Sequence, residues 1–194
     1  MRISNLVFQS LALRKDGKPR AERESYLMEL VGERVTGLAT QHYLTAAMLE
    51  GSEREPQACD AYEFLYGVDT VKVGFVDHPT IAMAGASPDR LVGADGLVEF
   101  KCPTLRTHLE TLLSGAIPEE HWPQMGWQMA CTGRAWCDFA SWHPSVPPAL
   151  RLWVKRLHRD EAQIAKDEEA VRGFLGEVQA RVSRLLAIAV AEAA

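Results

Sequence analysis

The chain has 194 residues, of which 47% are hydrophobic, and its formal net charge is −5. This composition excludes a disordered chain and indicates one folded domain with a substantial core. We expect a cytoplasmic protein, because no apolar run has the length of a membrane span and the N-terminus has no signal-peptide pattern. The negative charge disfavours general affinity for nucleic acid, so any DNA contact needs clustered basic residues or bound metal.

The four cysteines are scattered along the chain, and none of them forms a Cys-x-x-Cys pair. This spacing is typical of reduced thiols in a cytosolic protein rather than of a disulfide framework or a zinc knuckle. It also argues against an iron–sulfur nuclease, which needs a set of cysteine ligands.

The first part of the chain has the apolar spacing of helices. The segment between residues 14 and 20 is basic, and it is either a solvated connector or a contact to the DNA backbone. Gly37 is suited to end a helix, because glycine readily adopts the left-handed conformation that follows many helices. Apolar residues at intervals of three and four predict helices over residues 4–13, 22–36 and 43–49.

Ser52 and Glu55 have the spacing of a capping box, in which each side chain bonds the backbone of the other residue. This pattern predicts a helix that begins at Ser52 and runs to about Tyr66. Pro56 is compatible with that start, because the first turn of a helix tolerates proline. On this interpretation Glu55 is a structural cap.

Residues 90–101 have the pattern of a β-hairpin. Two strand-like runs flank a Gly-Ala-Asp-Gly turn at 93–96, and Pro103 ends the second run. With the other strand-like runs they predict a largely antiparallel sheet, in which His78 is a turn residue. The other strands are expected at residues 71–76, 80–84, 134–142 and 149–157.

The rest of the chain predicts helices again. Gln124 and Gln128 lie four residues apart and therefore share one helix face, which by itself indicates an ordinary polar surface. The last helix has heptad-like apolar spacing and is expected to pack on the sheet or on a neighbouring subunit. The tryptophans of the late strands are able to stack on bases, but core packing is the simpler interpretation. The late helices are predicted at residues 105–113, 119–131 and 160–191.

The predicted hairpin gathers three charged residues. Side chains two apart in a strand share a face, so Glu99 and Lys101 point the same way. Val98 and Phe100 then face the core, and Asp89 meets the charged pair across the hairpin. An isolated Glu-x-Lys is commonly a surface ion pair. Two carboxylates and one ammonium at one place instead suit metal-assisted phosphodiester hydrolysis, with Mg²⁺ as the metal.

The order Ser-Pro-Asp, about ten residues, then Glu-Phe-Lys-Cys-Pro resembles the PD-(D/E)xK nuclease signature. It is similar in particular to the lambda exonuclease (YqaJ-type viral recombinase) family. The resemblance implies an α/β (α+β) fold with a central mixed, largely antiparallel β-sheet flanked by helices, as in restriction endonucleases. It also implies a single nuclease domain with N-terminal helices, a catalytic sheet and a C-terminal helix, over residues 1–66, 67–157 and 158–194.

The resemblance also implies the roles of the central residues. Asp89, Glu99 and the backbone carbonyl of Phe100 would bind metal, with two Mg²⁺ ions per site and Mn²⁺ as an alternative. Lys101 would orient the attacking water or neutralise charge in the transition state.

Further residues are assigned to the site by the same resemblance. Glu55 lies in a Gly-x-x-x-Glu-x-x-Ala pattern before the sheet, and Gln124 lies in a glutamine helix after the Glu-x-Lys strand. The family usually has glycine after Ser-Pro-Asp and an arginine further upstream for the terminal 5′-phosphate. Here the residues assigned to contacts with DNA or this phosphate are Arg2, Ser4, Ser87, Arg90 and Gln128.

The implied activity is a metal-dependent 5′→3′ exonuclease that digests the 5′-ended strand of linear double-stranded DNA to mononucleotides and leaves 3′ overhangs. The implied partners are DNA ends, two further copies of the chain in a ring-shaped trimer, and a single-strand annealing protein of a phage or prophage recombination system. A restriction- or repair-type endonuclease is the nearest alternative. A DNA-binding or assembly module without turnover is another, which the intact Asp89, Glu99 and Lys101 disfavour.

Overall fold

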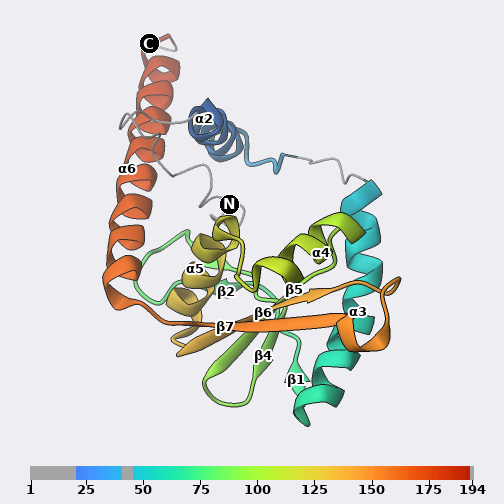
Figure 1. Cartoon of the computed structure of the whole chain (residues 1–194). Helices are drawn as coiled ribbons and strands as arrows, with labels where there is room; N and C mark the ends of the chain where they lie inside the picture. Colours follow the sequence, from blue (N-terminus) through green and yellow to red (C-terminus); the bar gives the residue numbers. More distant parts are fainter. Residues whose placement is uncertain (1–20, 41–45, 193–194) are drawn as a thin grey trace.

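The computed structural model describes residues 21–40 and 46–192, which are arranged around one central sheet (Figure 1). Its five strands have the spatial order β1 (Thr70–Val71), β4 (Arg90–Val92), β5 (Gly96–Lys101), β6 (Trp136–Trp142) and β7 (Leu152–His158). β5 and β6 run parallel, and the other neighbouring pairs are antiparallel. The predicted fold class, a mixed and largely antiparallel sheet flanked by helices, is confirmed.

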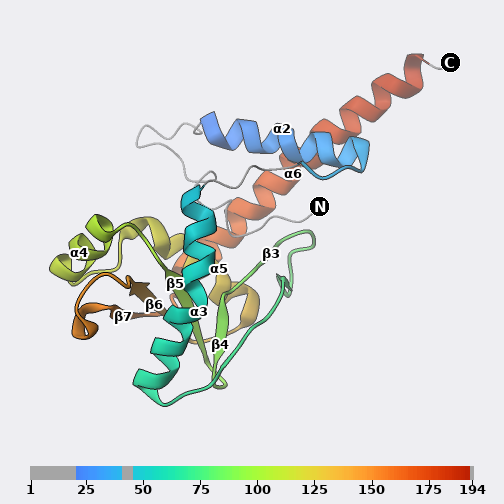
Figure 2. The same ribbon diagram turned by 90° about the vertical axis from the view of Figure 1, so that its right-hand side faces the viewer.

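Helices cover both faces of the sheet (Figures 1 and 2). On one face, α3 (Ala46–Tyr66) packs against Val98 and Phe100 of β5. On the other face lie α4 (Leu105–Ser114) and α5 (Trp122–Thr132), which form the crossover between β5 and β6. Both faces of β5 are therefore covered, and five of its six residues are buried.

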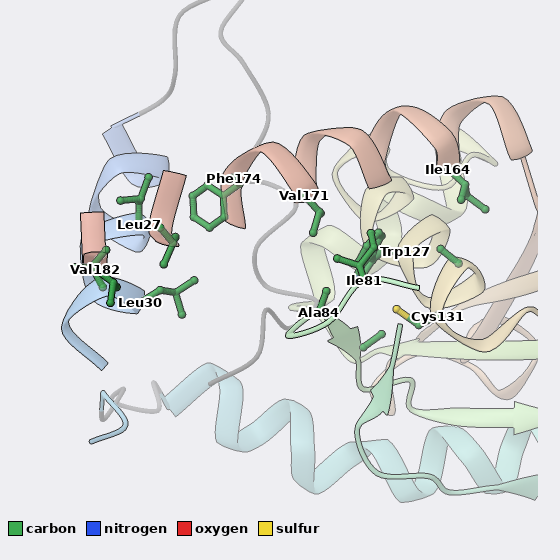
Figure 3. Packing of buried hydrophobic residues seen from close by; sticks show 14 residues of the cluster. Leu27, Leu30, Ile81, Ala84, Trp127, Cys131, Ile164, Val171, Phe174 and Val182 are labelled. Carbon is green, nitrogen blue, oxygen red and sulfur yellow. The ribbon is translucent and has the colours of Figure 1, made fainter. Parts of the chain in front are cut away.

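A further hydrophobic cluster lies along α6 (Glu161–Glu192), the long helix at one side of the molecule (Figure 3). α2 (Ala21–Thr36) packs against the part of α6 that continues past the sheet (Figure 2). Leu27 of α2 belongs to the same buried cluster as Phe174 and Val182 of α6. This packing explains the apolar spacing from which both helices were predicted.

The predicted end of α2 and the predicted start of α4 at residue 105 are confirmed. Gly37 has a φ of 72° and donates its N–H to the carbonyl of Glu33, so it ends α2. The Thr104 hydroxyl accepts the N–H of Thr107 at the start of α4. A short 3₁₀ turn, η2 (Glu119–His121), precedes α5, and another, η3 (Pro148–Leu150), precedes β7.

The predicted helix start at Ser52 is wrong. α3 is continuous from Ala46 to Tyr66, so Ser52 does not cap it and Pro56 lies in its interior. An interior proline removes one helical hydrogen bond. Burial of Ala58 and Tyr62 against the sheet stabilises the helix beyond that point and outweighs the local signal.

The strands expected at 71–76 and 80–84 are wrong in their extents. Only the ends of the first run are strand residues, in β1 and in β2 (Val76–Asp77), and β2 pairs with β3 (Gly85–Ala86) outside the main sheet. The second run is a turn rather than a strand, because His78 Nδ1 accepts the backbone N–H groups of residues 80 and 81. A turn had been expected only at His78.

Other predictions fall outside the described residues or concern the whole chain. The helix expected at 4–13, the basic segment at 14–20 and residues 43–45 lie outside them, whereas residues 46–49 of the helix expected at 43–49 belong to α3. None of the described helices is long and apolar enough to cross a membrane. The four cysteines are free thiols in the structure.

Candidate active site

The β4–β5 hairpin places Asp89 beside the second strand. Asp89 directly precedes β4, and its Oδ2 accepts the backbone N–H of Phe100 at 2.7 Å. The pairing of Arg90 with Val98 puts Asp89 opposite the start of the Glu99-Phe100-Lys101 segment. The structure thus brings together the two carboxylates that the sequence analysis expected to converge.

Glu99 is almost completely buried and is held by three donors. Its side chain is 2% exposed. Lys101 Nζ and Gln124 Nε2 donate to its Oε1 at 2.5 and 2.6 Å, and Gln128 Nε2 donates to its Oε2 at 2.7 Å. The last two side chains come from α5, so the helix that covers this face of the sheet also provides the polar partners of Glu99.

Lys101 remains a cation in this environment. Burial acts to lower its pKa, but the charge and the hydrogen bond of Glu99 together with the nearby Asp89 outweigh burial, so the net pKa lies above the usual value. Its Nζ also lies 3.4 Å from Gln124 Oε1. Lys101 is therefore suited to stabilise negative charge rather than to accept a proton.

Asp89 differs from Glu99 in its partners, because no cationic side chain among the described residues bonds directly to its carboxylate. Burial raises its pKa well above the ordinary range, and the nearby Glu99 raises it further. A divalent cation between these carboxylates would relieve their repulsion, and Mg²⁺ commonly takes only one or two carboxylates together with water. The pair therefore fits a metal, although no group of three His, Cys, Asp or Glu side chains suited to a metal occurs among the described residues.

Glu55 approaches the site from α3. Its Oε1 lies 3.2 Å from Nη1 of Arg90, and the same nitrogen donates to the carbonyl oxygen of Asp89 at 2.8 Å. Further along α3, the Tyr62 hydroxyl donates to buried Asp138 of β6 at 2.8 Å and fixes the helix to the sheet. Arg90, which was expected to contact DNA, therefore links Glu55 to the hairpin.

An open cleft of about 550 Å³ lies at the end of β5, between α3 and η2, and it is lined by Glu55, Asp89, Glu99 and Lys101. The cleft also includes His121 and Cys102, which the sequence analysis missed. His121 stacks on Phe139 with ring centroids 5.1 Å apart, and burial together with the Lys101 ammonium lowers its pKa. The position of Cys102 at the cleft could have been predicted from the sequence, because Cys102 directly follows Lys101. The position of His121 could not, because it depends on how η2 packs against the sheet.

The remaining assigned residues have different positions. Ser87 is exposed two residues before Asp89. Gln128 was expected at the DNA, but its side chain is fully buried and donates to Glu99. Arg2 and Ser4 lie outside the described residues.

The fold and the hairpin residues place the protein in the PD-(D/E)xK class of nucleases. The model of the YqaJ-like viral recombinase domain matches residues 12–135, and the chain belongs to this family.

Solved structures agree with this assignment. The chain is 40% identical to an alkaline exonuclease (LHK-Exo) from Laribacter hongkongensis, with a TM-score of 0.90 and coverage of 100% of this chain and 95% of that one. For LHK-Exo in complex with dAMP, the identity is 41%, with the same TM-score and coverage. A phage related exonuclease from Haemophilus somnus 129PT shares the fold at 14% identity, with a TM-score of 0.73 and coverage of 95% and 96%. No curated protein sequence matches the chain.

Proposed function

We propose that this protein is a metal-dependent exonuclease that digests the 5′-ended strand of linear double-stranded DNA to mononucleotides and leaves 3′ overhangs. The observation that carries the proposal is the convergence of Asp89, Glu99 and Lys101 in one open cleft. The similarity to an alkaline exonuclease over the full chain supports the reaction class. The dAMP in the second LHK-Exo structure is a deoxynucleoside monophosphate, the kind of product that such digestion releases.

The residues of the cleft have distinct roles in this proposal. Asp89, Glu99 and the carbonyl oxygen of Phe100 hold Mg²⁺, two ions per site, with Mn²⁺ able to substitute. When bound, the metal polarises the phosphate and lowers the pKa of the attacking water. Lys101 neutralises charge that develops on the phosphate, and Gln124 keeps the Lys101 ammonium and the Glu99 carboxylate in register.

Glu55 completes the carboxylate set at the cleft. It lies across from Asp89, where it adds negative charge, and Arg90 holds it there. We propose that the Glu55 carboxylate faces the metal and that Arg90 orients this carboxylate. Ser87, Arg2 and Ser4 are proposed contacts to DNA or to its terminal 5′-phosphate.

The partners follow from the family. We propose a ring-shaped homotrimer around linear DNA, working with a single-strand annealing protein of the same phage or prophage recombination system in the bacterial cytoplasm. A ring also suits a chain of net charge −5, because enclosure can retain DNA where electrostatic attraction alone is weak.

The test uses one linear duplex labelled separately at its 5′ and 3′ ends, beside the same sequence as a covalently closed circle. Each substrate is incubated with Mg²⁺, with chelator, and with the variants Glu99→Gln and Glu110→Gln. Glu110 is an exposed residue of α4 that pairs with Arg106, so Glu110→Gln is the matched carboxylate control.

We expect Mg²⁺-dependent release of mononucleotides from 5′ ends, an intact circle, an inactive Glu99→Gln variant and an active Glu110→Gln variant. Cleavage of the circle would instead indicate an endonuclease. A gel shift without hydrolysis of either substrate would indicate a binding module and would refute the catalytic roles.

A further inference from the structure

The carboxylate of Glu99 has little remaining capacity to accept hydrogen bonds. A carboxylate offers about four lone-pair positions, two on each oxygen. Lys101 and Gln124 use both positions on Oε1, and Gln128 uses one on Oε2. One position, on Oε2, is left without a donor among these three contacts.

We propose that Gln128 is a positioning residue that fixes the Glu99 carboxylate so that Oε2 presents its remaining lone pair to the divalent metal. This inference rests on the proposed function, and it assigns to Gln128 a part in metal binding rather than in DNA contact.

The surroundings of Gln128 determine which end of its amide faces Glu99. The Cys137 Sγ lies 3.9 Å from Gln128 Oε1. A thiol can donate or accept a hydrogen bond, whereas the Glu99 carboxylate can only accept one, so the amide nitrogen of Gln128 must face the carboxylate. The amide oxygen therefore faces the thiol.

Gln128 differs from Gln124 in what it can reach. Gln124 is half-buried next to the cleft and contacts Lys101 as well as Glu99. Gln128 is 0% exposed, one helical turn deeper in α5, so it cannot touch a substrate in the cleft. Any effect of Gln128 on the reaction must pass through Glu99.

Loss of this donor should weaken metal binding in particular. Without Gln128, the buried Oε2 has no fixed partner and the carboxylate can rotate away from the geometry that the metal requires. Partners that orient metal ligands in this way typically contribute about 10- to 100-fold to metal affinity. Turnover at saturating metal depends mainly on Lys101 and the ligands themselves, so it should fall much less.

The experiment measures Mn²⁺ binding to the full chain by calorimetry and by electron paramagnetic resonance, without DNA. Gln128→Met keeps the length of the side chain and removes the donor. Gln179→Met is the control, because Gln179 is exposed on α6, far along the chain from the cleft residues, and its amide donates to the Ser183 hydroxyl at 3.3 Å. For Gln128→Met we expect the Mn²⁺ dissociation constant to rise about 10- to 100-fold, and for Gln179→Met we expect no change.

DNA digestion gives the second measurement. The Mn²⁺ concentration for half-maximal digestion should rise in parallel for Gln128→Met, while the rate at saturating Mn²⁺ largely recovers. If Gln128→Met does not melt cooperatively, Gln128→Asn replaces it, because its shorter amide cannot reach Glu99 and should weaken Mn²⁺ binding in the same direction.

The outcomes separate this inference from the proposed function. A wild-type protein that binds Mn²⁺ and digests DNA, with unchanged or tighter Mn²⁺ binding in the folded variant, overturns only the role of Gln128. A wild-type protein that neither binds Mn²⁺ nor digests DNA overturns both.

Discussion

The two faces of β5 carry the same backbone but different kinds of stabilisation. On the α3 face, Val98 and Phe100 are packed among apolar side chains. On the α5 face, Glu99 and Lys101 are joined by hydrogen bonds to glutamines. Truncating a side chain on the apolar face lowers the stability of the fold roughly in proportion to the atoms removed. Removing a single donor on the charged face leaves a buried carboxylate without a compensating partner, which is costly. The apolar residues of this strand thus hold the fold, and the charged residues on its other face are those to which we assign the chemistry.

The largest effect should come from the charged side of this comparison. Lys101→Met removes the cation but keeps an unbranched side chain, so we expect digestion to slow by about 10³-fold. Mn²⁺ binding should persist, because Asp89 and Glu99 remain. Parallel calorimetry and nuclease assays test this separation, and a variant that loses Mn²⁺ binding would show that Lys101 organises the metal ligands instead.

A smaller effect is expected on the apolar side. Val98 is 0% exposed, and Val98→Ala leaves a cavity between β5 and α3. The free energy of unfolding should fall by about 2 kcal/mol. Denaturant unfolding measures this loss, and digestion well below the melting temperature should stay close to that of the wild type. A large loss of activity in the folded variant would mean that the two faces are not separable.

The smallest effect concerns pH. The raised pKa of Asp89 means that the metal-free carboxyl keeps its proton to higher pH than an ordinary aspartate. Metal must displace this proton, so Mn²⁺ affinity should increase with pH, by up to about tenfold per pH unit below the raised pKa. Calorimetric titrations at several pH values measure the slope, and Asp89→Asn should flatten it. A pH-independent affinity in the wild type would contradict the assignment.

The stability of the metal-free protein should fall as the pH rises, whereas its affinity for Mn²⁺ should increase. A carboxyl whose pKa is raised on folding stabilises the native state at low pH, and this contribution is lost as pH rises through the raised value. Metal-free protein should therefore melt at lower temperature as the pH increases, and added Mn²⁺ should reverse the trend.

The hairpin was predictable because its signals are local. The turn at 93–96 fixes the register, and strand alternation then puts Glu99 and Lys101 on one face with Asp89 opposite. The contact of Gln128 with Glu99 was not predictable, because it depends on how α5 docks on the sheet. The continuity of α3 through Pro56 was missed for a similar reason, since packing beyond the proline outweighs the capping signal at Ser52.

The parallel pairing of β5 with β6 constrains the order in which the molecule can fold. After β5, the chain must leave the sheet and run through α4 and α5 before it returns as β6. Glu99 and the two glutamines that hold it are therefore parts of the same crossover. A chain emerging from the ribosome lacks both glutamine donors to Glu99 until α5 has been synthesised and closes over the strand. The proposed site is therefore assembled together with the sheet, and a partly made chain lacks it.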